Sequence, residues 1–158
     1  LGIFDWGGMA ASSIGHKMWW WVYCSDFETF QANLDKYIEV FKTEYKAAGG
    51  PDIDSDKMKM MTILSAMEQM MGLVSAVPQI YRMCPKKEWP NIKDRYDPRI
   101  SENIDGKSTL RLYLHVMNTI LRIIQEMKGD EVLQKWISDV YVKQFGQAPK
   151  TEAMINGA

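Results

Sequence analysis

Hydrophobic residues between positions 27 and 45 recur at spacings of three and four, and this period constrains the fold more than any other feature of the sequence. The residues that carry the period are Phe27, Phe30, Leu34, Ile38, Phe41 and Tyr45. Such spacing places apolar side chains on one face of an α-helix. Ser25 and Glu28 match a capping box, and the Gly-Gly-Pro run at 49–51 is a helix stop. The pattern therefore predicts a helix over about 25–48 that packs one face on a core.

The same period returns further along the chain and predicts a mainly α fold of about five helices with a short N-terminal extended segment. A helix starting at Asp54 or Ser55 should end or kink near Val77, because Pro78 cannot continue it. Its methionines have two interpretations, an adaptable core helix, which we favour, or a promiscuous binding face. These methionines are Met58, Met60, Met61, Met67, Met70 and Met71.

Two more helices are predicted near the C-terminus. Ser108 should cap a helix to about residue 128, and Gly129 should end it. A further helix should run over 130–145 and terminate at Gly146. We expect residues 1–145 to form a single helical domain and residues 146–158 to form a C-terminal tail.

A short apolar stretch near the N-terminus predicts a buried helix from about His16 to Cys24. It is apolar around most of its circumference. Trp19, Trp20 and Trp21 point about 100° apart on such a helix, so we expect at least two of them to be buried.

Composition excludes some classes of protein. The chain has 158 residues and a net charge of -1, so no broad attraction to nucleic acid is expected. Its longest apolar run is too short to cross a membrane, which predicts a soluble protein without a transmembrane segment. Cys24 and Cys84 are expected to be buried reduced thiols, which fits a reducing compartment or an organelle interior.

Residues 85–105 are polar and interrupted by proline. Basic residues at 86, 87, 93, 95 and 99 alternate with Trp89 and Tyr96, a mixture that can contact single-stranded nucleic acid. Acidic residues at 88, 94 and 97 offset these charges. We therefore favour a long surface strap over a nucleic-acid site.

Few motifs in the sequence indicate catalysis or metal binding. His16 and His115 fall on different predicted helices, where a hydrogen-bonded histidine is favoured over a metal ligand. Residues 1–4 resemble the end of a strand, and Asp5, Trp6 and a Gly-Gly turn follow. An acid in this position is either a turn-capping residue or a metal ligand.

The segment GIFDWGG at 2–8 resembles the metal-binding segment of the aminoglycoside phosphotransferase and choline kinase-like families, which share the protein-kinase-like fold. The resemblance implies that Asp5 is the metal ligand, that Trp6 is the aromatic residue after it, and that the later helices form the C-terminal helical part of a kinase-like lobe. Only four residues precede Asp5, so the catalytic loop and the nucleotide lobe of those families are not in this chain.

Two functional hypotheses follow. The first is a non-catalytic helical segment or subunit, derived from a kinase-like phosphotransferase lobe and packed within a larger protein or assembly. The alternative is a fragment of an active small-molecule kinase, which would use Mg²⁺ and ATP, whereas the isolated chain would hold no cofactor and transfer no phosphate. The chain starts at Leu1, which predicts a removed leader or a longer polypeptide. The strand at 1–4 has no neighbour here, so its partner is another protein or an upstream part of the same polypeptide.

Overall fold

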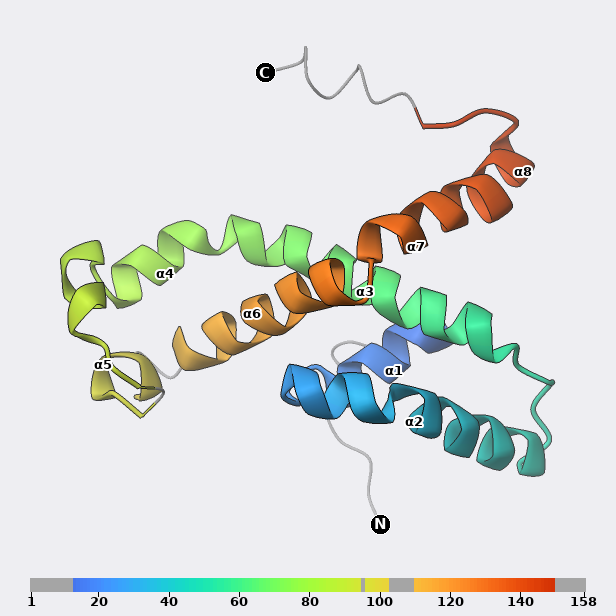
Figure 1. Ribbon diagram of the computed structural model, residues 1–158, viewed down its shortest axis with the longest axis horizontal. Coiled ribbons are helices and arrows are strands. Elements are labelled where there is room, and N and C mark those ends of the chain that lie inside the picture. The colour runs from blue at the N-terminus through green and yellow to red at the C-terminus, as the bar shows by residue number, and fades with distance from the viewer. Residues whose placement is uncertain (1–12, 95, 103–109, 150–158) are drawn as a thin grey trace.

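The computed structural model describes residues 13–94, 96–102 and 110–149. Within these ranges the protein is mainly α, as predicted, and contains no strand (Figure 1). Its longer helices are α1 (Ile14–Val22), α2 (Phe27–Ala47), α3 (Ser55–Ser75), α4 (Val77–Met83), α6 (Leu110–Glu126) and α7 (Gly129–Trp136). The predicted extended segment at 1–4, Asp5 and the Ser108 cap lie outside the described residues.

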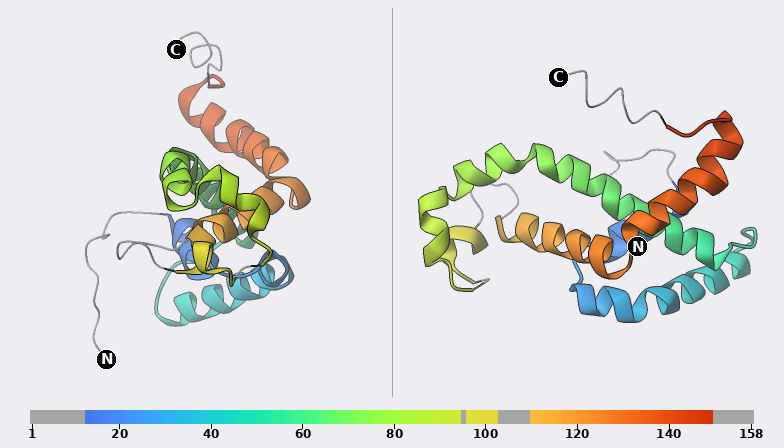
Figure 2. Two further views of the ribbon diagram at one scale, coloured as in Figure 1. Left: turned by 90° about the vertical axis from the view of Figure 1, so that its left-hand side faces the viewer. Right: turned by 45° about the horizontal axis from the view of Figure 1, so that its top comes forward.

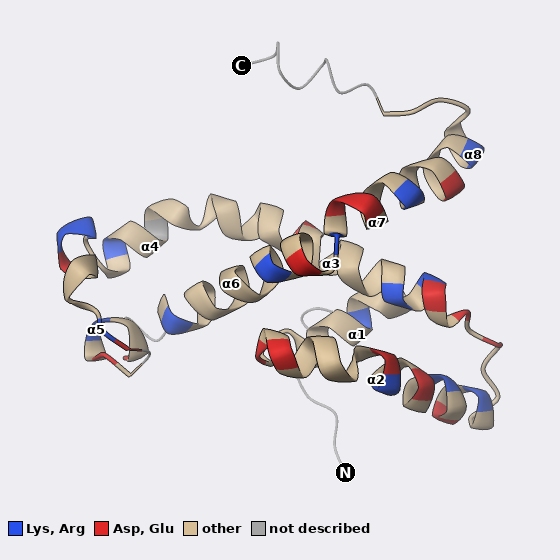
Figure 3. Ribbon diagram, in the orientation of Figure 1, with Lys and Arg blue, Asp and Glu red and all other residues tan. Residues whose placement is uncertain are grey.

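Helix α3 is the centre of the fold, because α1, α2, α6 and α7 all contact it. Helices α2 and α7 lie on opposite sides of α3 (Figure 2). The main cluster, as we call the larger core, joins α1, α2, α3 and α6. It consists of Met18, Trp19, Phe27, Phe30, Leu34, Ile38, Met58, Ile63, Ala66, Val116, Ile120 and Ile123. Charged residues of both signs cover the outer side of α2 and the start of α3 (Figure 3). Among them, Lys59 forms an ion pair with Asp35 at 2.7 Å.

Helix α1 crosses α3 closely at Gly15. A Cβ atom at this position would lie 2.6 Å from the backbone carbonyl carbon of Met61, closer than real Cβ contacts come. The helix begins at Ile14, two residues before the predicted start, and Ser13 Oγ accepts a hydrogen bond from the His16 amide at 3.1 Å. Glycine is therefore required here by packing between two helices.

The expectation that at least two of the three tryptophans are buried is wrong. Trp19 is 1% exposed, whereas Trp20 is 47% and Trp21 is 64% exposed. Successive residues point about 100° apart, and only one face of α1 meets α3, so only one of the three rings can enter the core. Trp21 instead lies against Phe41 at the rim, with ring centroids 5.5 Å apart.

The start of α2 also differs from the prediction. The N-cap residue is Asp26, and the Ser25 hydroxyl donates to the Val22 carbonyl at 2.6 Å. The capping box does not form, because the N-cap position is one residue later than predicted and Glu28 is then not the third residue of the helix. The predicted stop is confirmed, with Gly49 in the left-handed region at φ 89°.

Helix α3 ends where proline requires it. Asp54 caps its start by accepting from the Lys57 amide at 3.0 Å. The helix ends at Ser75, and Pro78 lies in the first turn of α4, a position where a missing amide hydrogen costs little.

The turn between α6 and α7 contradicts the predicted stop at Gly129. The left-handed residue is Lys128, at φ 56°, and Gly129 is the buried first residue of α7. A Cβ on Gly129 would lie 3.0 Å from Ile124 Cα and 3.1 Å from Met67 Sδ, so the glycine allows close packing. The helical stretch continues through a π-helical turn (Ile137–Tyr141) and α8 (Val142–Phe145), and it ends at Gly146 as predicted.

The strap region contains two short helices, η2 (Lys86–Asn91) and α5 (Pro98–Ser101). With α4 and the start of α6 they enclose a second cluster, made of Ile80, Cys84, Ile100 and Leu110. Trp89 donates its indole hydrogen to the Cys84 carbonyl at 2.8 Å. Arg99 binds Asp97 through two nitrogens, at 2.8 and 2.6 Å, and donates to the Asn91 carbonyl at 2.8 Å.

The cysteines differ from each other. Cys84 is buried, as expected, but Cys24 is exposed, because it follows the C-terminal end of α1. Both are free thiols. None of the described helices combines the length and apolar character that crossing a membrane requires.

Candidate functional site

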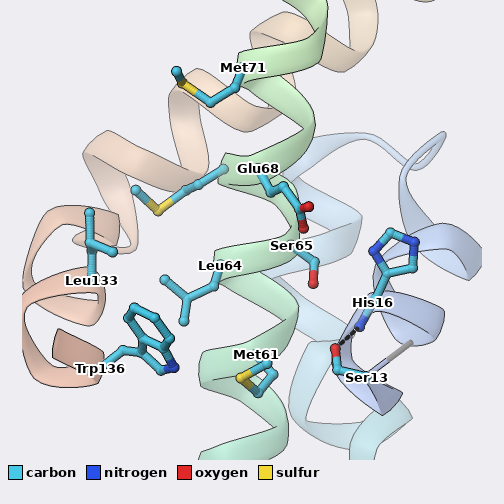
Figure 4. A pocket seen from close by; sticks show the side chains of 10 residues that line it. Ser13, His16, Met61, Leu64, Ser65, Glu68, Met71, Leu133 and Trp136 are labelled. Atoms are coloured by element: carbon cyan, nitrogen blue, oxygen red, sulfur yellow. Dashed lines mark hydrogen bonds between the residues drawn. The ribbon is translucent and has the colours of Figure 1, made fainter. Parts of the chain in front are cut away.

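A groove runs along the outer face of α3, between α1 and α7, with a cavity volume of about 610 Å³. We call it the α3 groove. Its lining residues are Ser13 and His16 from α1, Met61, Leu64, Ser65, Met67, Glu68 and Met71 from α3, and Leu133 and Trp136 from α7 (Figure 4).

The helical period of α3 divides its side chains between the core and the groove. Residues 61, 64, 65, 68 and 71 recur at helical spacing and form one surface ridge. The other face of α3 is buried at Thr62, Ile63 and Ala66. The core interpretation of the methionines holds for Met58, which is buried, but Met71 is 75% exposed at the end of the groove.

One side of the groove is apolar. Leu133 and Trp136 on α7 face α3 across the groove, near Leu64 (Figure 4). Close packing at Gly129 brings the start of α7 against Met67. This wall depends on the α6–α7 turn.

The other side is polar and comes from α1 and α3. Ser65, Glu68 and His16 lie together on this side (Figure 4). His16 Nε2 accepts a hydrogen bond from the Trp20 indole at 2.6 Å. This contact ties the His16 ring to its own helix, α1.

Glu68 is the charged carboxylate of this lining. It is exposed, and the ion pairs found among the described residues do not include it. The α3 groove thus combines an apolar wall with one carboxylate that has no ion-pair partner among the described residues.

Histidines, cysteines and acidic residues of the described ranges do not form a metal centre. In the described ranges, no three histidine, cysteine or acidic side chains are placed to hold a metal ion. His115 Nε2 lies 3.1 Å from the carbonyl oxygens of Cys24 and Ser25, so each histidine has its own hydrogen-bond partners. Asp5, the candidate metal ligand, is outside the described residues.

Sequence reasoning missed the α3 groove. The methionine-rich helix was the available signal, and a binding face was one of its two interpretations, but the core interpretation was favoured. The contributions of Glu68, His16 and Trp136 had no local signal, because three separate helices bring them together.

Comparisons with family models, with curated proteins and with solved structures found no match to this chain. The resemblance of residues 2–8 to the kinase-like families stays a prediction from sequence.

Proposed function

We propose that this chain is a non-catalytic helical unit that binds a helix of a partner protein in the α3 groove. The observation that carries the proposal is Met71, a large apolar side chain that is 75% exposed at the end of the α3 groove. Burial of a large exposed apolar side chain by a partner removes it from water, which stabilises the complex.

The dimensions and chemistry of the groove support a helical occupant. Met71 lies ten positions after Met61 on α3, which is a rise of about 15 Å. That length accommodates anchors from about three turns of a docking helix, which recur at i, i+3/i+4 and i+7. Methionine side chains are flexible and polarisable, so they adapt to the shape of an apolar partner.

A site-specific cross-linking experiment tests this proposal. A photoreactive amino acid replaces Met71 in one variant and Val40 in a matched control. Val40 is also exposed, at 55%, but lies on α2 outside the groove. We expect a protein adduct from the Met71 variant alone. Equal labelling from both positions, or none from Met71, contradicts the proposal.

A second candidate function comes from the sequence observation at residues 2–8. In this proposal the chain is the C-terminal helical part of a small-molecule kinase, and Asp5 holds Mg²⁺ for ATP. The isolated chain should then show no ATP-dependent phosphate transfer, whereas a longer parent polypeptide should show it and lose it on Asp5→Asn substitution. Turnover by the isolated chain, or full activity of the Asp5→Asn parent, contradicts this candidate.

A further inference from the structure

We infer that the partner helix presents a lysine or arginine to Glu68, so that the α3 groove selects basic amphipathic helices. This inference rests on the proposed function and adds the chemistry of the partner. It depends on the polar side of the groove, where Glu68 faces the same space as His16 and Ser65 (Figure 4).

The charges around the groove favour a cation in the partner. The neighbouring His16 ring is already engaged, because its Nε2 accepts a hydrogen bond from the Trp20 indole. On α7 and beyond, Glu131 pairs with Lys128 and Asp139 with Lys143. Other exposed charged residues near the groove are Lys17 on α1 and Asp130 and Lys135 on α7. The ion pairs found among the described residues connect none of these to Glu68.

Docking of a partner helix changes the hydration of the Glu68 carboxylate. A helix lying on the α3 ridge covers Glu68 and removes water from it. A buried unpaired carboxylate is costly, whereas a charge-assisted hydrogen bond to lysine or arginine offsets the lost hydration. A helix with an acidic or apolar residue at this point is therefore disfavoured, which gives the groove specificity as well as affinity.

The two sides of the groove also determine which positions of the partner helix are apolar and which is basic. The apolar anchors should face Leu64, Met71 and Trp136, while the basic residue should lie on the flank that faces α1 (Figure 4). Because the polar and apolar sides flank the same ridge, the basic residue should sit at one fixed offset from the anchors. An apolar small molecule would not show this pattern.

Selection from a library of displayed helices tests the inference. Each member is a helix of roughly 18 residues, long enough to be helical. It has apolar anchors at i, i+3, i+4 and i+7 and random residues elsewhere. The full chain is the target. Selected clones should be enriched in lysine or arginine at one position relative to the anchors. Their affinity should fall at least tenfold for the Met71→Glu target, a change at an exposed position that the fold tolerates.

Charge reversal at Glu68 provides the decisive comparison. With Glu68→Lys as the target, the enriched residue at that position should change to aspartate or glutamate. The control Glu44→Lys has the same charge change at an exposed residue of α2 away from the groove and should leave the preference for basic residues unchanged.

The outcomes separate the inference from the proposed function. Clones that depend on Met71 but show no basic preference overturn the inference and leave the proposed function standing. The absence of Met71-dependent clones overturns both. A dimer of the chain that Met71→Glu dissociates, seen by sedimentation, also overturns the inference, because the occupant is then a second copy.

Discussion

The main cluster and the second cluster are held together in different ways. The main cluster draws on α1, α2, α3 and α6 and includes fully buried rings such as Trp19 and Phe30, which meet edge to face at 5.8 Å. The second cluster is smaller, and polar contacts made by Arg99 and Trp89 surround it. Apolar burial thus dominates one region, while hydrogen bonds to backbone carbonyls and a carboxylate fasten the other.

This difference predicts unequal stability. Regions with few buried apolar contacts open locally at lower free energy than the core of a domain. We therefore expect the second cluster and the strap to exchange amide hydrogens through local opening, and the main cluster to exchange them only through global unfolding.

The largest expected effect comes from removing a ring of the main cluster. Trp19→Ala should lower the free energy of unfolding by about 3–5 kcal/mol, because it leaves a cavity and an unpaired Gln69 amide. The control Trp21→Ala removes a ring that is 64% exposed and should cost less than about 1 kcal/mol. Urea denaturation measures both values. Equal losses would contradict the assignment of Trp19 as the buried member of the three.

An isoleucine pair compares the two clusters directly. Ile120→Ala in the main cluster should cost about 2–5 kcal/mol in global stability. Ile100→Ala in the second cluster should cost less than half of that loss, because fewer buried neighbours surround it. Hydrogen exchange should show Ile100→Ala accelerating exchange mainly over 80–102. If both variants lower global stability equally, the two clusters form one cooperative unit.

The close crossing of α1 and α3 gives the next effect. Gly15→Ala should destabilise the protein by about 1–3 kcal/mol, because the new methyl group overlaps the backbone of Met61. Gly72→Ala is the matched control within α3, where a Cβ meets nothing within 4 Å. That change should stabilise the protein by about 0.5–1 kcal/mol. Thermal unfolding measures the opposite signs, and a neutral Gly15→Ala variant would contradict the crossing.

The smallest effect is local and depends on pH. Hydrogen bonds from the Arg99 side chain lower the pKa of Asp97 from 3.8 to about 2. A lowered pKa in the folded state means that the stabilisation is present above pH 3.8 and is lost as the pH falls through about 2. Fluorescence of the nearby Trp89 should follow this loss. Asp97→Asn should show the acid signal already at neutral pH, and an unchanged acid transition in this variant would exclude the Arg99 contact as its cause.

Local sequence signals by themselves determined the course of the longer helices, although not the short helices η2 and α5. The three-four period of α2, the stops at Gly49 and Gly146 and the break before Pro78 all agree with the structure. These signals act within one or two turns of backbone, through steric limits on φ and the loss of an amide hydrogen.

Only the tertiary structure decided which faces are covered. Trp19 is buried because it lies against α3 and donates to Gln69, 50 residues away, at 2.5 Å. Its neighbours Trp20 and Trp21 are the same residue type on the same helix, but their side chains are exposed. Gly15 lies just before the predicted start of this helix at His16, yet the crossing of two helices requires it.

The α3 groove shows the same division. The methionine-rich helix was predicted as a helix, and a binding face was one of its two interpretations. The groove itself needs α1, α3 and α7 in fixed positions, because its apolar wall and the carboxylate of Glu68 come from different helices. Helical period defines an apolar face, but burial depends on which distant segment covers that face, and this is a property of the packed chain.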